Sequence, residues 1–188
     1  MNKTITKEFN SHLKVSQDSM TTISKPIEES AKLCIKCLQN SGKIIFFGNG
    51  GSAGDAQHIA AELVGRYKKE RKGLAAIALT TDTSALTCIS NDYGYEKVFS
   101  RQIEAIANTN DLVIGISTGG TSENVINGLK AAKLIGCNTI GFSGRAGGEF
   151  NKICDVNIIV PADETARIQE MHILIGHIIC QLIDAVYA

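Results

Sequence analysis

The 188-residue sequence lacks a charge excess of either sign and a long apolar run. Its 19 Lys and Arg balance 19 Asp and Glu, whereas a nucleic-acid or anionic-membrane surface needs a clustered excess of basic residues. No apolar stretch approaches the ~20 residues that span a bilayer, and no hydrophobic block follows the lysines of residues 1–8. We therefore expect a single cytoplasmic domain over residues 1–188, without a membrane or nucleic-acid partner.

The six cysteines lack the pattern of a disulfide scaffold or of a structural zinc site. Cys34 and Cys37 have the CxxC spacing, but they lie in an amphipathic helical stretch. No second CxxC follows that would complete a set of four metal ligands. We interpret these thiols as buried groups that pack like small apolar side chains.

Residues 1–42 predict two helices. Apolar side chains recur at helical spacing over residues 5–23 and again over 27–38. Pro26 suits a first helical turn, where its missing N–H costs no hydrogen bond. We expect this segment to form an arm that packs in an oligomer, next to an α/β core and a C-terminal helix in residues 43–188.

Beyond residue 42, five short apolar runs alternate with longer segments. The runs are residues 43–47, 74–79, 111–116, 138–142 and 156–160. Most of them lack polar alternation, as do strands that are covered on both faces. The segments between them are long enough for crossover helices. The sequence therefore predicts an α/β fold with a parallel five-stranded sheet flanked by helices.

The last predicted helix, over residues 166–187, is apolar around most of its circumference. A helix of this kind must be buried on nearly every side. A terminal helix on a small α/β domain usually has one exposed face. We therefore expect this long C-terminal helix to lie in an interface between copies of the chain.

A loop rich in glycine and hydroxyl groups spans residues 115–124, after one predicted strand and before a helix. Free backbone N–H groups at a helix start favour an anion, and the hydroxyls of Ser117, Thr118 and Ser122 add uncharged donors. No lysine follows the glycines, so this loop is not a nucleotide P-loop. Its donors suit a phosphate monoester. The alternative is a plain helix cap with Ser and Thr as filler.

A second glycine-rich loop, residues 48–54, leads into a helix that carries His58 and Glu62. The loop is not the G-x-G-x-x-G of dinucleotide-binding proteins. His58 and Glu62 are four residues apart, so they share one helix face and can bind a divalent metal or exchange a proton. A surface ion pair is the alternative interpretation.

His177 lies in the most apolar part of the last helix. A buried imidazole needs a partner, and a satisfied core histidine is the usual explanation. Gln169 precedes it by two turns, about 12 Å along the axis. Both residues can therefore reach one ion only by leaning together or by belonging to different chains. His172 points away from His177, and we interpret it as structural.

In combination, these segments resemble the sugar isomerase (SIS) domain family and, within it, the phosphoheptose isomerases. The resemblance is carried by Gly48-Asn49-Gly50-Gly51-Ser52, His58-x-x-x-Glu62, Asn91-Asp92, Ser117-Thr118-Gly119-Gly120-Thr121-Ser122, and Arg167-Ile168-Gln169-Glu170-Met171-His172 with His177. It implies a flavodoxin-like sheet and a homotetramer with active sites between subunits. It also implies isomerisation of sedoheptulose 7-phosphate to D-glycero-D-manno-heptose 7-phosphate through an enediol, the first step toward activated heptose for lipopolysaccharide or capsule.

The resemblance further implies roles for individual residues. Glu62 and His177 would be catalytic. One zinc ion per subunit would be held by His58, Glu62, Gln169 and His177. The substrate would be bound by Asn49, Gly50, Gly51, Ser52, Glu62, Asn91, Asp92, Ser117, Thr118, Gly119, Ser122 and Gln169.

Two other functions are compatible with such a fold. One is a non-catalytic module that binds the replication initiator DnaA, and the other is an isomerase of a different sugar phosphate. The DnaA-associating proteins lack the acidic and imidazole groups that this chain has at Glu62 and His177. Neither alternative is expected to combine Gln169 with His177. The sequence therefore favours the heptose phosphate isomerase.

Overall fold

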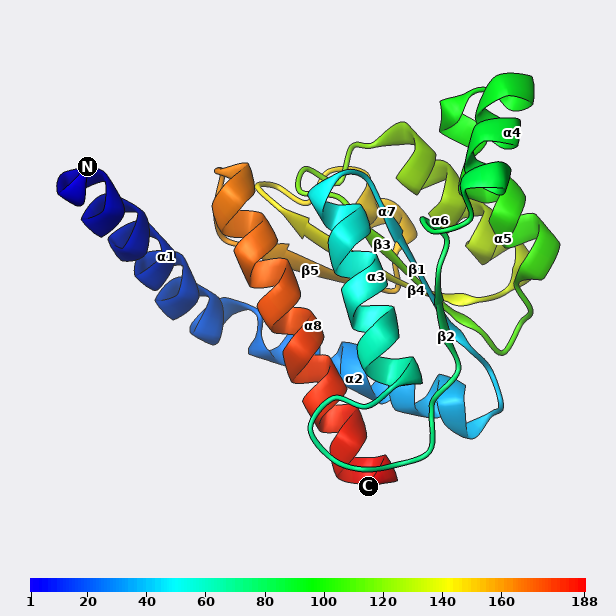
Figure 1. The fold of residues 1–188 in the computed structure, drawn as a ribbon, viewed down its shortest axis with the longest axis horizontal. Coiled ribbons are helices and arrows are strands. Elements are labelled where there is room, and N and C mark those ends of the chain that lie inside the picture. The colour runs from blue at the N-terminus through cyan, green and yellow to red at the C-terminus, as the bar shows by residue number, and fades with distance from the viewer.

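The computed structural model describes residues 1–188 as a parallel five-stranded sheet between two layers of helices (Figure 1). The strands are β1 (Ile44–Gly48), β2 (Ala76–Ala78), β3 (Leu112–Ile116), β4 (Asn138–Gly144) and β5 (Val156–Val160). Their order in the sheet is β2-β1-β3-β4-β5, and every neighbouring pair is parallel. This is the flavodoxin-like order, so the predicted fold class is confirmed.

Helices connect the strands and also precede and follow them. They are α1 (Asn2–Thr22), α2 (Ser24–Gln39), α3 (Gly51–Val64), α4 (Thr83–Tyr93), the short 3₁₀ helix η1 (Tyr95–Lys97), α5 (Ser100–Ile106), α6 (Glu123–Ile135), α7 (Phe150–Ile153) and α8 (Thr165–Tyr187). Because parallel strands need crossover connections, these helices cover both faces of the sheet.

Strand β1 shows why the predicted strands have no polar alternation. Ile44 and Phe46 belong to the apolar core that α2, α3 and α8 share with the sheet. Ile45 and Phe47 belong to a second core, on the side of α5 and α6. All four side chains are buried, since both faces of this central strand are covered.

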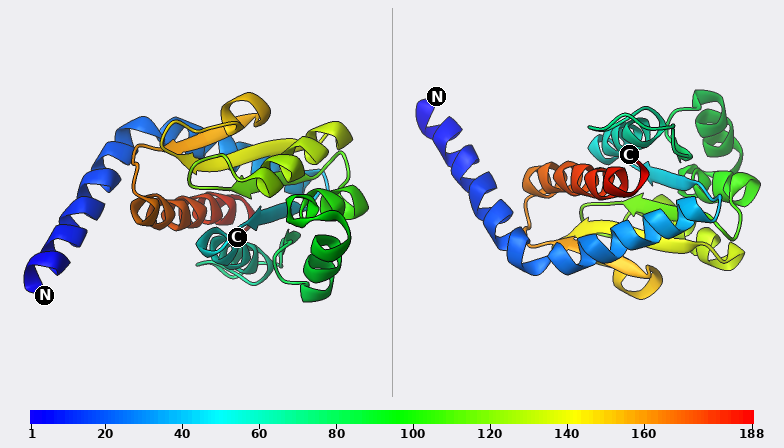
Figure 2. Two further views of the ribbon diagram at one scale, coloured as in Figure 1. Left: turned by 90° about the horizontal axis from the view of Figure 1, so that it is seen from above. Right: turned by 90° about the horizontal axis from the view of Figure 1, so that it is seen from below.

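The two N-terminal helices differ in their packing. Helix α2 lies against the sheet, and its residues Ile27 and Cys34 are part of the core. Helix α1 projects away from the body of the molecule, as both views in Figure 2 show. Its apolar residues Ile5 and Phe9 are 55% and 68% exposed. The outer part of α1 therefore has an apolar face that its own chain leaves uncovered.

Helix α8 is long and apolar enough to cross a membrane by length and composition alone. It packs against α2 and α3, with Ile168, Ile175 and Ile183 buried, so we interpret it as a core helix of the domain. Four of its apolar side chains are still exposed: Leu174, Ile178 and Leu182 at 38% each, and Val186 at 51%. The expected all-round burial is thus incomplete within one chain.

The cysteines are all free, and no disulfide links Cys34 to Cys37. Both of these thiols are buried, as the sequence predicts. Burial raises the pKa of Cys37 to about 11. These two residues are therefore packing groups, whereas Cys88 is exposed.

Candidate functional site

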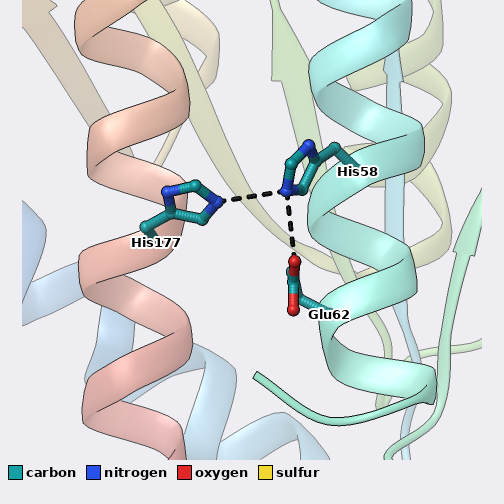
Figure 3. Close-up of side chains that lie close together, drawn as sticks. All are labelled: His58, Glu62 and His177. Atoms are coloured by element: carbon teal, nitrogen blue, oxygen red, sulfur yellow. Dashed lines mark hydrogen bonds and ion pairs between the residues drawn. The ribbon is translucent and has the colours of Figure 1, made fainter. Parts of the chain in front are cut away.

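His58 and Glu62 of α3 point toward His177 of α8 (Figure 3). The Nε2 atom of His58 lies 3.1 Å from Oε1 of Glu62 and 3.1 Å from Nε2 of His177. The nearest ligand atoms of all three residues lie within 4.8 Å of one another. Two groups that the sequence analysis identified separately, on different helices, thus form one cluster.

The cluster forms because α3 and α8 run side by side in the same direction (Figure 1). Near the start of the pair, Gly51 lies against the side chain of Gln169. Two turns later, Gly176 packs against Ile59. Since glycine has no side chain, the two helices approach closely at this point, and His177 comes within reach of His58.

The donor set of two imidazoles and a carboxylate suits a zinc ion, and two of its three separations have the spacing of zinc ligands. Zinc bonds to histidine nitrogen at about 2.0–2.1 Å, so two ligands of a tetrahedral ion lie about 3.3 Å apart. The 3.1 Å between the two Nε2 atoms is close to this separation. The side chains of His58 and Glu62 are 49% and 25% exposed, so the cluster is open to solvent. Two imidazoles and a carboxylate with an open position are typical of catalytic zinc sites.

Gln169 lies apart from this cluster within one chain. Its side chain is next to Gly51, about 12 Å along α8 from His177. No hydrogen bond joins Gln169 to any of the three residues. A single chain therefore brings together three of the four predicted metal ligands.

Tyr67 is part of the site, although the sequence analysis did not identify it. Its ring stacks on the imidazole of His177, with the centroids 5.3 Å apart and the planes 23° apart. Tyr67 lies in the segment that follows α3, which has no periodicity or motif. Its contact with His177 depends on how α8 packs, so nothing in the local sequence signals it.

Asp55 is a second residue that the sequence analysis did not assign to the site. It lies on α3 one turn before His58, and its Oδ2 atom is buried without a hydrogen-bond partner. Burial raises the pKa of Asp55 to about 6, although the nearby His58 opposes this shift. The residue as a whole is half-buried, and it makes no hydrogen bond to His58, Glu62 or His177.

The loop between β3 and α6 presents hydroxyl and N–H donors together. The hydroxyl oxygens of Ser117 and Ser122 lie 2.9 Å apart. Ser122 precedes α6, yet its side chain does not cap that helix. The N–H groups of Glu123 and Asn124 donate to no protein acceptor. This arrangement suits a phosphate group, and a plain capping role for Ser122 does not explain it.

Backbone conformation fixes the shape of this loop. Gly120 has a φ of +63° and packs directly on the backbone of Gly147. A side chain at this position would be strained and would collide with that neighbouring backbone. Thr118 and Gly119, which the resemblance assigns to substrate binding, lie half-buried just before this turn.

The two glycine-containing loops are joined by a pair of amides. Asn49 Nδ2 donates to Asn124 Oδ1 at 2.9 Å, and Asn124 Nδ2 donates back to Asn49 Oδ1 at 2.8 Å. The hydroxyl of Tyr95 also donates to Asn49 Oδ1, at 3.0 Å. Asn49 is a predicted substrate ligand, whereas Asn124 and Tyr95 were not predicted. The pair holds the loops after β1 and β3 in a fixed relation.

The remaining predicted residues lie in the same region or on α4. Gly50 has a φ of +55° at the start of α3, and Ser52 is buried in the first turn. Asn91 and Asp92 are exposed on α4, where Asn91 Nδ2 donates to Asp92 Oδ1 at 2.8 Å. No hydrogen bond connects these two residues to the loops or to the cluster.

Comparisons with known proteins show which family this chain resembles. A family model described as the SIS domain matches residues 8–144. A phosphoheptose isomerase of Aliarcobacter butzleri is 58% identical over 184 residues, which cover 98% of this chain and 97% of the relative. The solved structure of phosphoheptose isomerase from Neisseria gonorrhoeae is similar, with 44% identity, a TM-score of 0.93 and 98% coverage of each chain. That of a phosphoheptose isomerase from Francisella tularensis has 34% identity, a TM-score of 0.94 and 97% coverage of each chain.

Proposed function

The chain belongs to the phosphoheptose isomerases of the SIS domain family, which are aldose–ketose isomerases, and on this premise we propose how its residues divide the reaction. The reaction interconverts sedoheptulose 7-phosphate and D-glycero-D-manno-heptose 7-phosphate, in heptose biosynthesis. It moves a proton between neighbouring carbons and therefore needs a base over those carbons and an acid near the oxygens. The convergence of Glu62 and His177, with His58 between them, is the observation that supports our assignment.

Glu62 is the base in this proposal. It removes the proton from the carbon next to the ketone and returns it to the neighbouring carbon. Its Oε1 atom faces His58, while Oε2 makes no hydrogen bond within the protein. One carboxylate oxygen can thus face a metal while the other takes the proton. His177 transfers protons at the substrate oxygens, and the Tyr67 ring orients its imidazole by stacking.

His58, Glu62 and His177 would hold a zinc ion, which would supply Lewis-acid stabilisation of the negative charge on the substrate oxygens. The expected ligand set has four members, and one chain brings together three of them. We propose that Gln169 of the partner subunit supplies the fourth, because Gln169 is two turns from the cluster within its own chain. The same glutamine also contacts a sugar hydroxyl in this proposal.

The phosphate of the substrate is bound by Ser52, Ser117, Thr118 and Ser122 in this proposal. The hydroxyl pair of Ser117 and Ser122 and the free N–H groups at the start of α6 support it. Sugar hydroxyls are bound by Asn49, Gly50, Gly51, Gly119, Asn91 and Asp92. The amide pair between Asn49 and Asn124 then sets the distance between the sugar and the phosphate.

We further propose that the active unit is a cytoplasmic homotetramer with active sites at its subunit interfaces. Two uncovered apolar surfaces support this assembly. They are the outer face of α1, with Ile5 and Phe9, and the stripe on α8 that contains Leu174 and Ile178. Apolar surfaces of this kind on a soluble domain are typical of interfaces between copies.

Product analysis tests the assignment directly. The purified enzyme is incubated with sedoheptulose 7-phosphate, with and without a chelator, and the heptose phosphates are separated. We expect conversion by the untreated enzyme and its loss after chelation, with recovery when zinc is added. Glu62→Gln and His177→Asn should each lose most turnover while they remain folded. Turnover near the wild-type rate in either variant would contradict the roles that we assign.

A further inference from the structure

Arg71 and Asp184 form an ion pair inside the protein, next to the cluster of His58, Glu62 and His177. Arg71 Nε donates to Asp184 Oδ1 at 2.7 Å, and the two side chains are 0% and 2% exposed. Arg71 lies in the segment after α3, and Asp184 lies on α8. The pair therefore links the two helices that carry the predicted metal ligands.

The guanidinium of Arg71 holds the end of α3. Its Nη2 atom donates to the backbone carbonyl of Glu62 at 2.9 Å, and Nη1 donates to the carbonyl of Leu63 at 2.9 Å. These carbonyls lie in the last turn of α3, where a helix leaves acceptors unpaired. One side chain thus satisfies the helix end and fixes the backbone of a predicted metal ligand.

The carboxylate of Asp184 holds the segment that contains Tyr67. Its Oδ2 atom accepts the N–H groups of Lys68 and Lys69 at 3.0 Å and 3.2 Å. These residues directly follow Tyr67, whose ring stacks on His177. Asp184 lies seven residues after His177 and therefore on the same face of α8.

We propose that Arg71 and Asp184 are positioning residues for the cluster of His58, Glu62 and His177. They hold Glu62 and the Tyr67 ring against the face of α8 that carries His177. This inference rests on the proposed function of the cluster. Residues that hydrogen-bond to metal ligands fix the ligand geometry, and their mutation typically weakens metal binding by about 10–100-fold. A merely structural ion pair would lower the unfolding temperature and leave the zinc affinity of the folded protein unchanged.

The chain contains a closely matched control for Asp184. Asp111 is also buried, accepts two backbone N–H groups, from Lys43 and Asn108, and pairs with the ammonium of Lys43. It precedes β3 and makes no hydrogen bond to α3 or α8. The substitutions Asp184→Asn and Asp111→Asn therefore remove similar buried charges in different places.

The experiment measures zinc affinity by competition with a chromogenic chelator, together with thermal unfolding. Both substitutions should lower the unfolding temperature. We expect Asp184→Asn to weaken zinc binding by about tenfold or more, and Asp111→Asn to leave it within about twofold of wild type. Arg71→Lys serves if Asp184→Asn does not fold, because it keeps the charge but loses the planar fork. It should weaken zinc binding similarly.

The variant His58→Asn is measured as well, because it distinguishes a failure of the proposed metal site from a failure of the positioning role alone. If wild type binds no zinc, or if His58→Asn binds it as wild type does, the metal site itself is wrong. If His58→Asn loses zinc while Asp184→Asn and Arg71→Lys keep wild-type affinity, only the positioning role is overturned. Weaker binding in all three variants, with Asp111→Asn unchanged, supports both.

Discussion

Gly176 of α8 packs against the side chain of Ile59 of α3 so closely that a Cβ atom would come within 2.6 Å of Ile59 Cγ1. Each of these residues is directly next to a histidine of the cluster, His177 and His58. Ile59 is only 2% exposed, so it has little room to move. The close approach of these two residues therefore sets the spacing between the two histidines.

Gly176→Val should separate α3 from α8. The added side chain cannot fit against Ile59, so the helices must move apart or repack, at a cost of about 1–3 kcal/mol. We expect a lower unfolding temperature and a loss of kcat of at least about tenfold, because small displacements of catalytic groups are costly. Activity assays with sedoheptulose 7-phosphate and thermal unfolding measure the two effects.

Gly54→Ala provides the matched control on α3. Gly54 is also a helical glycine, but a Cβ there would meet nothing within 4 Å. Since alanine favours the helix over glycine by about 1 kcal/mol, Gly54→Ala should stabilise the protein slightly. If Gly176→Val retained both stability and turnover, the contact between Gly176 and Ile59 would not set the spacing of the two histidines.

The sequence predicted the sheet well because its signal is local. Apolar runs without alternation and the glycines that follow them indicate buried parallel strands, and all five predicted strands are present. The largest difference is the run at residues 74–79, where only Ala76–Ala78 form β2. β2 lies at the edge of the sheet and pairs only with β1, so hydrogen bonds from one side alone support it. Ile77 is accordingly 40% exposed.

The site was predictable only in part. His58 and Glu62 share a helix face, so their spacing shows in the sequence, and His177 stands out as an imidazole in an apolar stretch. Whether these three residues meet depends on how α8 packs against α3, and no pattern in the sequence predicts that packing. Tyr67 and Asn124 were missed for the same reason, since each acts through a contact with a residue far away in the chain.

Asn124→Ala should weaken substrate binding without slowing the chemical step. The substitution leaves the amide of Asn49 without its reciprocal partner, and an unpaired polar group of this kind costs about 1–3 kcal/mol. Because the loops bind the phosphate and the sugar equally in the ground state and the transition state, KM should rise about tenfold with kcat little changed. Steady-state kinetics with sedoheptulose 7-phosphate separates the two constants.

Asn127→Ala is the control for that measurement. Asn127 lies one turn further along α6, and its Nδ2 atom donates to the carbonyl of Glu96 at 3.0 Å. Its loss removes a comparable hydrogen bond outside the loops, so KM should stay near the wild-type value. Equal changes of KM in both variants would show that the amide pair has no special role.

His172 should make the protein less stable in acid. Its Nε2 atom lies 3.0 Å from the carbonyl oxygen of Ser143 and donates to it, and the side chain is fully buried. Burial lowers the pKa of His172 to about 4, against an ordinary value of about 6.5 in the unfolded chain. Between these values the unfolded state binds the proton and the folded state does not. The free energy of unfolding therefore falls as pH drops from 6.5 to 4.

The size of this effect follows from the two pKa values. A difference of about 2.5 units corresponds to about 3 kcal/mol, lost over that pH range and not further below it. Urea unfolding at a series of pH values should show this loss in wild type, and His172→Gln should show a flatter profile. Parallel profiles for the two proteins would exclude His172 as the source.

Ile178→Lys should disrupt the assembly and, with it, the active site. Ile178 lies on the α8 stripe and is 38% exposed in the isolated chain, and a buried charge at an interface is strongly unfavourable. If Gln169 of the partner subunit completes the site, loss of the tetramer should remove turnover and weaken zinc binding together. Light scattering coupled to size-exclusion chromatography measures the mass of the particle.

Leu134→Lys changes an apolar residue on α6 that is 90% exposed, and it should leave both mass and turnover unchanged. A monomeric Ile178→Lys variant with full turnover would show that one chain forms the complete site.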